Sequence, residues 1–210
     1  TPGRPAAEFD YLSPSRRKTI PVKNIGGTHQ PIVIADRFDE STEVDEQFKP
    51  DYIYCGHTLP ENRCEGIPYI VDAYNWEPEM ENTYPAFSYK EIFSMHFSKA
   101  DVKFLFLPYM ALDREVKAAL RIHPEVVIIA QSSHVNRLGE FRAMAHELMD
   151  SGIENPVVYF QFYEEENAED FQIKAAADMG ALIFDGLCDG LFLFNQGDLS
   201  HQVVDATAFN

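Results

Sequence analysis

Polar and ionisable side chains follow several short apolar runs of this chain. We expect these runs to be strands of a parallel sheet, which collects its ligands just past the carboxyl ends of its strands. The residues at these positions are Asp36, Arg37, Cys55, His57, Asp72, Gln131, Ser132, His134, Gln161, Tyr163 and Asp185. Carboxylates and amides dominate this set, and it holds a single arginine. A phosphate-bearing ligand needs several cations, amide donors or a metal ion, so the set disfavours such a ligand.

Phosphate and metal motifs do not strengthen the case for a ligand site. The chain contains neither G-x-x-x-x-G-K-[ST] nor a G-x-G-x-x-G that opens a helix. Cys55, His57 and Cys64 could suit zinc, but their spacing matches no familiar structural-zinc motif and no fourth ligand is evident. The third cysteine, Cys188, forms no C-x-x-C with the others, so we predict no metal site and no iron–sulfur cluster within this chain.

Two kinds of hydrolytic site remain as alternatives. Ser132 or Ser133 could act with His134, but no G-x-S-x-G elbow is present, and a polar loop before a helix explains these residues equally well. A paired-carboxylate hydrolase would draw on Asp72, Asp185 and residues 164–166, which are three consecutive glutamates. Such a run of glutamates is more typical of a solvated loop.

The elements that must position these residues are clearest between Asn155 and Phe194. An apolar run at 156–161 is followed by an acidic break and then by a helical pattern that begins at the expected N-cap Asn167. We expect this helix to end at Gly180 and a second apolar run to lead to Asp185, which places its carboxylate at the ligand edge of the sheet. The pattern predicts a parallel βαβ unit.

Eight strand candidates occur between Ile32 and Phe194. They lie at 31–35, 51–55, 68–71, 104–107, 126–130, 156–161, 181–185 and 191–194. Eight parallel strands are typical of a TIM barrel, but the span is well short of the roughly 250 residues that this fold usually takes. We therefore predict an α/β fold, a reduced or distorted TIM-barrel-like parallel β/α domain that lacks some helices. An open doubly wound sheet is the alternative. Residues 76–85, aromatic and acidic, are expected to form a surface loop.

Composition limits the partners of the chain. Its 210 residues are 45% hydrophobic and 24% charged, as expected for one globular domain, and the formal net charge is −17. An acidic surface disfavours nucleic acid and anionic membranes as partners. We expect no membrane span, because no apolar run approaches ~18 residues. The 3 cysteines, an odd number, indicate a reducing compartment, and we expect the cytoplasm.

Three segments follow from these patterns. Residues 1–30 are rich in proline and hold the basic cluster Arg16, Arg17, Lys18 and Lys23, so we predict an extended N-terminal segment or linker. Residues 31–194 form the predicted barrel. Residues 195–210 are predicted to be a connector toward a further domain.

One segment also supports a family assignment. Residues 176–190 read AADMGALIFDGLCDG and closely resemble the "GALL-DGLGDG" segment of the long form of 4-hydroxy-3-methylbut-2-enyl diphosphate synthase. Cys188 stands where that pattern has a glycine. Residues 205–210 are similar to the short lead-in to the cluster domain of this family. The resemblance implies that the chain is the inserted central domain of such an enzyme, a second and degenerate barrel between a catalytic barrel and a C-terminal iron–sulfur domain.

The resemblance also implies where the chemistry lies. The family reductively opens 2-C-methyl-D-erythritol 2,4-cyclodiphosphate in non-mevalonate isoprenoid biosynthesis, with electrons from ferredoxin or flavodoxin. Its 4Fe–4S cluster is bound by residues beyond Asn210, so we expect no cofactor and no catalytic residue in this chain. Asp185, Gly186, Asp189 and Gly190 match the family turn and are expected to be structural. Two functions remain open: a non-catalytic spacer, or a small acidic barrel with its own hydrolase or ligand-binding site made of strand-end carboxylates.

Overall fold

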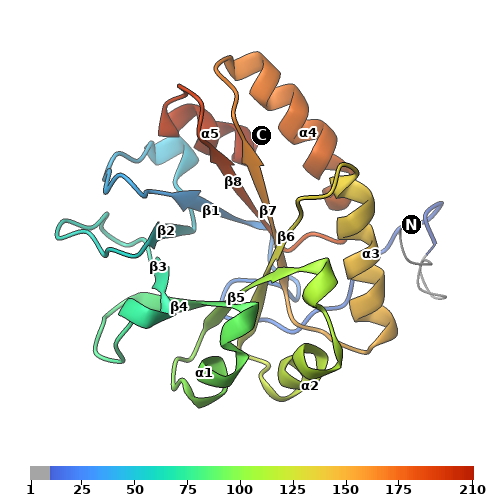
Figure 1. Cartoon of the computed structure of the whole chain (residues 1–210). Helices are drawn as coiled ribbons and strands as arrows, with labels where there is room; N and C mark the ends of the chain where they lie inside the picture. Colours follow the sequence, from blue (N-terminus) through green and yellow to red (C-terminus); the bar gives the residue numbers. More distant parts are fainter. Residues whose placement is uncertain (1–9) are drawn as a thin grey trace.

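The computed structural model describes residues 10–210 and shows a closed barrel of parallel strands (Figure 1). Its strands are β1 (Ile32–Asp36), β2 (Tyr52–Gly56), β3 (Tyr69–Asp72), β4 (Thr83–Ser88), β5 (Lys103–Pro108), β6 (Val126–Gln131), β7 (Val157–Tyr163) and β8 (Gly190–Asn195). Each strand pairs with the next, and β8 closes the ring on β1 with Val33 opposite Leu191. The predicted TIM-barrel-like fold is confirmed, and the open doubly wound sheet is wrong.

The outer layer of helices is uneven around the ring. The α-helices are α1 (Ile92–Phe97), α2 (Arg114–Ile122), α3 (Arg137–Asp150), α4 (Ala168–Phe184) and α5 (His201–Phe209), and short 3₁₀ turns occupy Glu46–Phe48, Ala73–Asn75, Tyr89–Glu91 and Tyr109–Ala111. Within the described residues, the connections from β1 to β4 carry only such turns. The barrel is therefore reduced on the β1–β4 side, as its short sequence predicted.

The strand count was right, but one predicted strand was wrong and one strand was missed. Residues 181–184 form the last turn of α4 and not a strand. The helix passes Gly180, where an added Cβ would meet nothing within 4 Å, and ends at Phe184 with Asp185 as its C-cap. Gly186 follows with a φ of +69°, which suits the residue after a helix cap. The missed strand is β4, which lies in part of the predicted loop. Its Pro85 lies opposite Val71 in the ladder, and a proline argues against a strand in sequence patterns.

Two apolar layers hold the barrel together, because successive strand residues point to opposite faces. Inside the ring lie side chains such as Phe104, Val127 and Phe192, each fully buried. Between strands and helices lie others such as Phe141 and Phe171. Burial of large side chains on both faces of each strand explains why the strands appear in the sequence as continuous apolar runs.

The ends of the described chain pack on the barrel. Arg17, 4% exposed, donates to the backbone carbonyls of Ile153 and Asn155 at 2.6 and 3.0 Å, and Ile25 is fully buried. Helix α5 contacts β8 and β1. Residues 1–9 of the predicted N-terminal segment lie outside the described residues. The division into 1–30, 31–194 and 195–210 remains a prediction about the longer protein.

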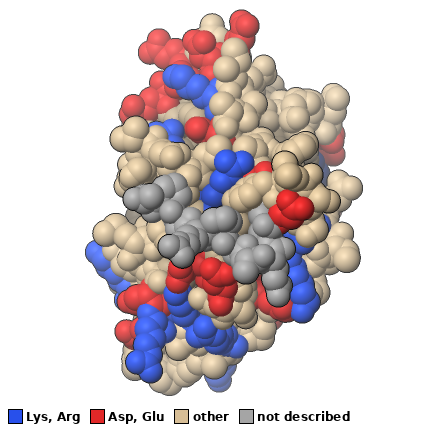
Figure 2. Space-filling model, turned by 90° about the vertical axis from the view of Figure 1, so that its right-hand side faces the viewer, with Lys and Arg blue, Asp and Glu red and all other residues tan. Residues whose placement is uncertain are grey.

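Charged side chains are distributed without a dominant basic area on the face shown in Figure 2, where acidic and basic groups lie interspersed. Across residues 10–210, no helix combines the length and apolar character that crossing a membrane requires.

Candidate functional site

A cavity of about 610 Å³ opens at the carboxyl end of the strands, which we call the mouth cavity. Its lining consists of Phe38, Tyr54, His57, Asp72, Ala73, Tyr74, Ala86, Ser88, Tyr89, Glu91, Phe106, Gln131 and Phe160. Most of these residues point into the ring from the ends of β2 to β7, so parallel pairing alone brings them together. This is the position at which TIM barrels bind their ligands.

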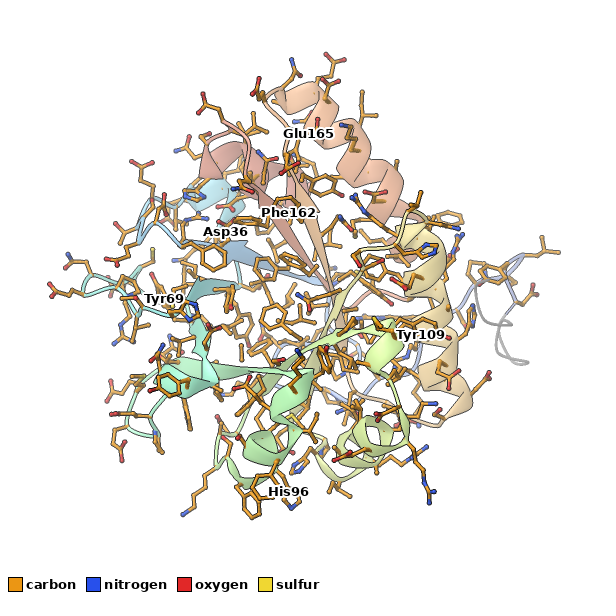
Figure 3. All side chains as sticks on the ribbon, in the orientation of Figure 1. Asp36, Tyr69, His96, Tyr109, Phe162 and Glu165 are labelled. Carbon is orange, nitrogen blue, oxygen red and sulfur yellow. The ribbon has the colours of Figure 1, made fainter. Side chains whose placement is uncertain are left out.

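Aromatic rings form the walls and floor of the mouth cavity. Tyr54 packs edge-on against Phe38 and Phe192 with ring centroids 5.3 and 5.6 Å apart, and it lies 5.3 Å from Phe106. Phe106 in turn contacts Phe160 at 6.4 Å. In Figure 3, Phe162 lies toward the inner side of the strand ring, whereas His96 lies outside the ring, on α1. The rings fill the interior of the barrel beneath the mouth cavity.

Asp72 is the central polar group of the mouth cavity. The Tyr54 hydroxyl donates to Oδ1 of Asp72 at 2.6 Å, and His57 Nδ1 lies 2.7 Å from Oδ2. Burial of Tyr54, together with its bond to Asp72, raises the pKa of the phenol, so the hydroxyl stays protonated and keeps donating. The two contacts fix the orientation of the carboxylate, whose side chain is 25% exposed.

A second carboxylate lies on the neighbouring part of the rim, just after β4, the strand that pairs with β3. Glu91 Oε2 accepts from the Ser88 backbone N–H at 2.8 Å, and the Ser88 side chain accepts from Lys90 N. This capping box fixes the side chain of Glu91, the last residue of the short 3₁₀ turn after β4. None of the residues that line the mouth cavity is lysine or arginine.

Arg37, the one arginine of the predicted strand-end set, is directed away from the mouth cavity. Its Nη2 lies 2.6 Å from Asp205 Oδ2 on α5, and its Nη1 donates to the Asp36 carbonyl at 2.6 Å. The Arg37 residue is 1% exposed. Burial raises the pKa of the neighbouring Asp36 to about 6, an effect that Asp205 strengthens and that His201 and Arg37 oppose. This cluster ties α5 to β1.

The predicted serine–histidine pair is a loop before α3. His134 is exposed, and its backbone N–H donates to Ser132 Oγ at 3.2 Å, while the Ser132 hydroxyl donates to Glu140. The Asn136 side chain then caps α3 by accepting from Gly139 N at 2.9 Å. These contacts organise the helix entry.

Alternation along β7 turns Gln161 and Tyr163 outward. The Tyr163 hydroxyl donates to Asp178 on α4 at 3.1 Å, and Gln161 donates to the Phe162 carbonyl at 3.0 Å. Both had been placed on the ligand rim from their position at the strand end. Their side chains belong to the layer between β7 and the helices.

The cysteines near His57 have separate partners. The Cys55 thiol donates to the Ile70 carbonyl and the Cys64 thiol to the Thr42 carbonyl, each at 3.3 Å. Burial raises the pKa of Cys55 to about 11, which disfavours the thiolate that zinc requires. Residues 10–210 contain no group of three or more His, Cys, Asp or Glu side chains placed to hold a metal ion.

The family turn lies at the other end of the barrel. Asp185 ends α4 and Asp189 precedes β8, so both sit at the amino ends of the strands, and the prediction that Asp185 lies on the ligand edge is wrong. This follows from the length of α4, which includes the residues expected to form a strand. Asp72 and Asp185 are therefore at opposite ends of the ring. They cannot act as the carboxylate pair of a hydrolase.

Contacts of the family turn join it to the N-terminal segment. Asp189, 2% exposed, accepts from Val157 N at 3.0 Å, Thr19 Oγ1 at 3.2 Å and Arg16 Nη2 at 3.1 Å. Asp185 accepts from Arg142 Nε at 2.8 Å.

Glycine is required at two positions of this turn. A Cβ on Gly186 would lie 2.7 Å from Arg16 Cα, and one on Gly190 would lie 2.7 Å from Ile32 Cγ1. The residue after Asp185 also has a positive φ, which only glycine adopts at low cost. Close packing therefore leaves no room for a side chain at either place.

Sequence reasoning missed most of the mouth cavity. Tyr54 was expected only as part of the strand at 51–55, and Ser88 and Glu91 were not among the predicted strand-end residues. The Ser-x-x-Glu spacing of a capping box was a usable signal for the turn after β4. The walls could not be found, because they depend on which strand ends meet across the ring.

Comparison with known proteins agrees with the resemblance of residues 176–190. The chain is 65% identical over 208 residues to the 4-hydroxy-3-methylbut-2-en-1-yl diphosphate synthase (flavodoxin) of Phocaeicola vulgatus. The aligned residues make up 99% of this chain and 34% of that protein. The match to the same enzyme of Bacteroides thetaiotaomicron is also 65% over 208 residues, with the same shares. The enzyme of Parabacteroides distasonis is 38% identical over 192 residues, 91% of this chain and 31% of that protein.

The predicted resemblance is therefore confirmed, and it extends over nearly the whole chain. The chain spans about a third of the length of these curated relatives. No protein-family model matches the chain. No solved structure matches it either.

Proposed function

We propose that this chain is the inserted central domain of a long-form 4-hydroxy-3-methylbut-2-enyl diphosphate synthase and acts there as a non-catalytic spacer. Its partners would be a catalytic barrel and an iron–sulfur domain of the same polypeptide. The identity of 65% over 99% of the chain supports the parent enzyme, and the 34% share of that enzyme supports a role as one domain among several. We place the protein in the cytoplasm, in keeping with its three free cysteines.

The observation that carries the spacer role is the charge of the mouth cavity. A cyclic diphosphate needs cations or a set of amide donors to offset its negative charge. The mouth cavity offers the carboxylates of Asp72 and Glu91 and no lysine or arginine, and the buried guanidinium of Arg37 is already paired with Asp205. Repulsion of the substrate at the usual ligand position of the fold argues that substrate binds to another domain.

The parent reaction would then take place outside these residues. It is a two-electron reductive ring opening of 2-C-methyl-D-erythritol 2,4-cyclodiphosphate in isoprenoid biosynthesis, with loss of water and with electrons from flavodoxin or ferredoxin. The 4Fe–4S cluster would be held by residues of the flanking domain. This chain would contribute a rigid closed barrel that separates the two functional domains and lets them close on the substrate.

Substitution of the mouth cavity in the full-length enzyme tests this role. Asp72→Asn and Glu91→Gln remove the negative charge of the two carboxylates while preserving their size. We expect kcat and kcat/KM for the cyclic diphosphate to stay within about twofold of the unsubstituted enzyme, since neither group touches substrate. Asp198→Asn, an exposed position in the loop after β8, is the matched control. A tenfold or greater loss of kcat by Asp72→Asn, with an unchanged melting temperature, would show that the mouth cavity takes part in the reaction.

A further inference from the structure

The mouth cavity has the composition of a site for a cation. Its lining includes the aromatic side chains of Phe38, Tyr54, Tyr74, Tyr89, Phe106 and Phe160 and the carboxylates of Asp72 and Glu91, with no lysine or arginine. We propose that the mouth cavity binds a small organic cation, an ammonium or guanidinium group, with Asp72 as its counter-ion and the aromatic rings as its walls. The spacer role says nothing of such a ligand, and neither proposal depends on the other.

Asp72 is held in place yet can still accept from a ligand. Tyr54 occupies one acceptor position of Oδ1 and His57 lies at Oδ2, which leaves further lone-pair directions on both oxygens. The carboxylate side chain remains 25% exposed toward the cavity. A bound cation would therefore find an oriented anion whose hydrogen-bonding partners are already set, so that little reorganisation is needed on binding.

The aromatic walls of the mouth cavity favour cations, as its two carboxylates do. The negative faces of phenol and phenyl rings attract ammonium and guanidinium groups within about 6 Å of the ring centre. The chain already makes this contact at the rim, where Lys90 Nζ lies 5.7 Å from the centroid of the Tyr89 ring. The more interior rings Phe106 and Phe160 are half-buried, so part of each remains open to a ligand.

The size of the mouth cavity suits a ligand with a few carbon atoms around its charge. At about 610 Å³ it falls within the range of ordinary small-molecule sites. An anion would meet two carboxylates there, and a neutral polar ligand would lose the attraction of both the carboxylates and the rings. The geometry therefore predicts that, among ligands of similar size and shape, the mouth cavity prefers the positively charged one.

The preference can be measured with a pair of probes that differ mainly in charge. Nα-acetyl-arginine methylamide and its citrulline counterpart have the same length, but only the first is cationic. We expect saturation-transfer NMR on the full-length protein to show binding of the arginine probe in the millimolar range, with at least fivefold weaker binding of the citrulline probe. Cation–π and ion-pair contributions of this kind support a difference of that size.

Two substitutions link the preference to the mouth cavity. Asp72→Asn should weaken binding of the arginine probe at least fivefold and reduce its advantage over citrulline. Tyr74→Ala, at a side chain that is 92% exposed and so dispensable for folding, should weaken it about twofold to threefold. Asp198→Asn should leave binding unchanged. Unfolding midpoints of all variants should be compared first.

Three results would overturn the proposal. The arginine probe could fail to bind the unsubstituted protein, the citrulline probe could bind equally well, or Asp72→Asn could leave arginine binding unaltered in a folded variant. Failure here leaves turnover of the parent enzyme unaffected, whereas failure of the spacer role appears as a loss of kcat.

Discussion

Asp189 joins three parts of the chain, and its replacement by asparagine should destabilise the barrel more than any other change at the family turn. One oxygen accepts from Thr19 and Arg16, and the other accepts from Val157 N at 3.0 Å, with Arg17 Nη1 4.0 Å away. Asparagine has the same shape, but its amide nitrogen must face donors on one side. At least one buried donor would lose its partner, and the negative charge beside Arg17 would be removed.

The magnitude follows from these contacts. A hydrogen bond to a charged group contributes ~1.5–3 kcal/mol, and leaving a buried charge without its partner costs ~3–5 kcal/mol. Asp189, 2% exposed, and Arg17, 4% exposed, are shielded from water, so their interaction is not discounted for solvent. The Arg16 side chain is 32% exposed, so its ion pair with Asp189 is screened and adds little to the value. We expect Asp189→Asn to lower the free energy of unfolding by about 3–5 kcal/mol and the melting temperature by ~10 °C.

Asp185→Asn provides a comparison within the same turn. Its partner Arg142 has a side chain that is 32% exposed, so solvent screens the ion pair and the expected loss is only about 1 kcal/mol. Asp198→Asn, exposed and away from the turn, should change stability by less than about 0.5 kcal/mol. We therefore expect the loss of unfolding free energy to be largest for Asp189→Asn, smaller for Asp185→Asn and smallest for Asp198→Asn.

Urea unfolding of the 210-residue chain, followed by far-UV circular dichroism, measures the ranking, and turnover is measured in parallel on the full-length enzyme. Equal midpoints for Asp189→Asn and the unsubstituted chain would refute the claim that this carboxylate holds the N-terminal segment to the barrel. A large loss of kcat at an unchanged midpoint would instead make the turn catalytic, against its expected structural role.

Three further predictions concern pH, the glycines and the cofactor. Burial raises the pKa of Asp36 from 3.8 to about 6, so the folded chain holds its proton more tightly than the unfolded chain. The free energy of unfolding should therefore fall as pH rises from about 4 to about 6, by at most ~3 kcal/mol, and Asp36→Asn should remove this dependence in urea titrations at several pH values. Gly186→Ala should destabilise the folded chain by ~1–3 kcal/mol, because φ is +69° and the added Cβ would lie 2.7 Å from Arg16 Cα. Gly180→Ala, inside α4 and open to solvent, should stabilise the folded chain by ~0.5–1 kcal/mol. Reversed signs of these two effects in thermal unfolding would contradict the expectation. The isolated chain should show no 4Fe–4S absorbance after reconstitution with iron and sulfide, and a stoichiometric cluster would refute the expectation that its ligands lie elsewhere.

Sequence patterns determined the class of fold because burial on both faces of a strand is a local property. A run such as Val126–Gln131 shows this burial as consecutive apolar residues. The alternation of such runs with amphipathic helices predicts a parallel barrel before any tertiary contact is known. The helix cap at Asn167 was equally readable, because a cap bonds to backbone only two or three residues away.

Sequence patterns did not determine where an ambiguous segment ends. Residues 181–184 suit a strand or a helix, and the packing of fully buried Leu182 between α4 and the barrel decides for the helix. That single choice moves Asp185 from the ligand end of the barrel to the opposite end. At β4, pairing with β3 and β5 outweighs the proline that argued against a strand.

The candidate site depended on the tertiary structure most of all. Arg37 looked available to a phosphate until the fold supplied Asp205, 168 residues along the chain, as its partner. Asp72 and Tyr54 acquire their shared hydrogen bond only when neighbouring strands are in register. By itself the sequence determined the strands, the helix caps and the acidic character of the chain, since each reflects neighbours close along the backbone. Only ring closure decided which side chains face one another across the mouth cavity, because those distances are set by strands far apart in sequence.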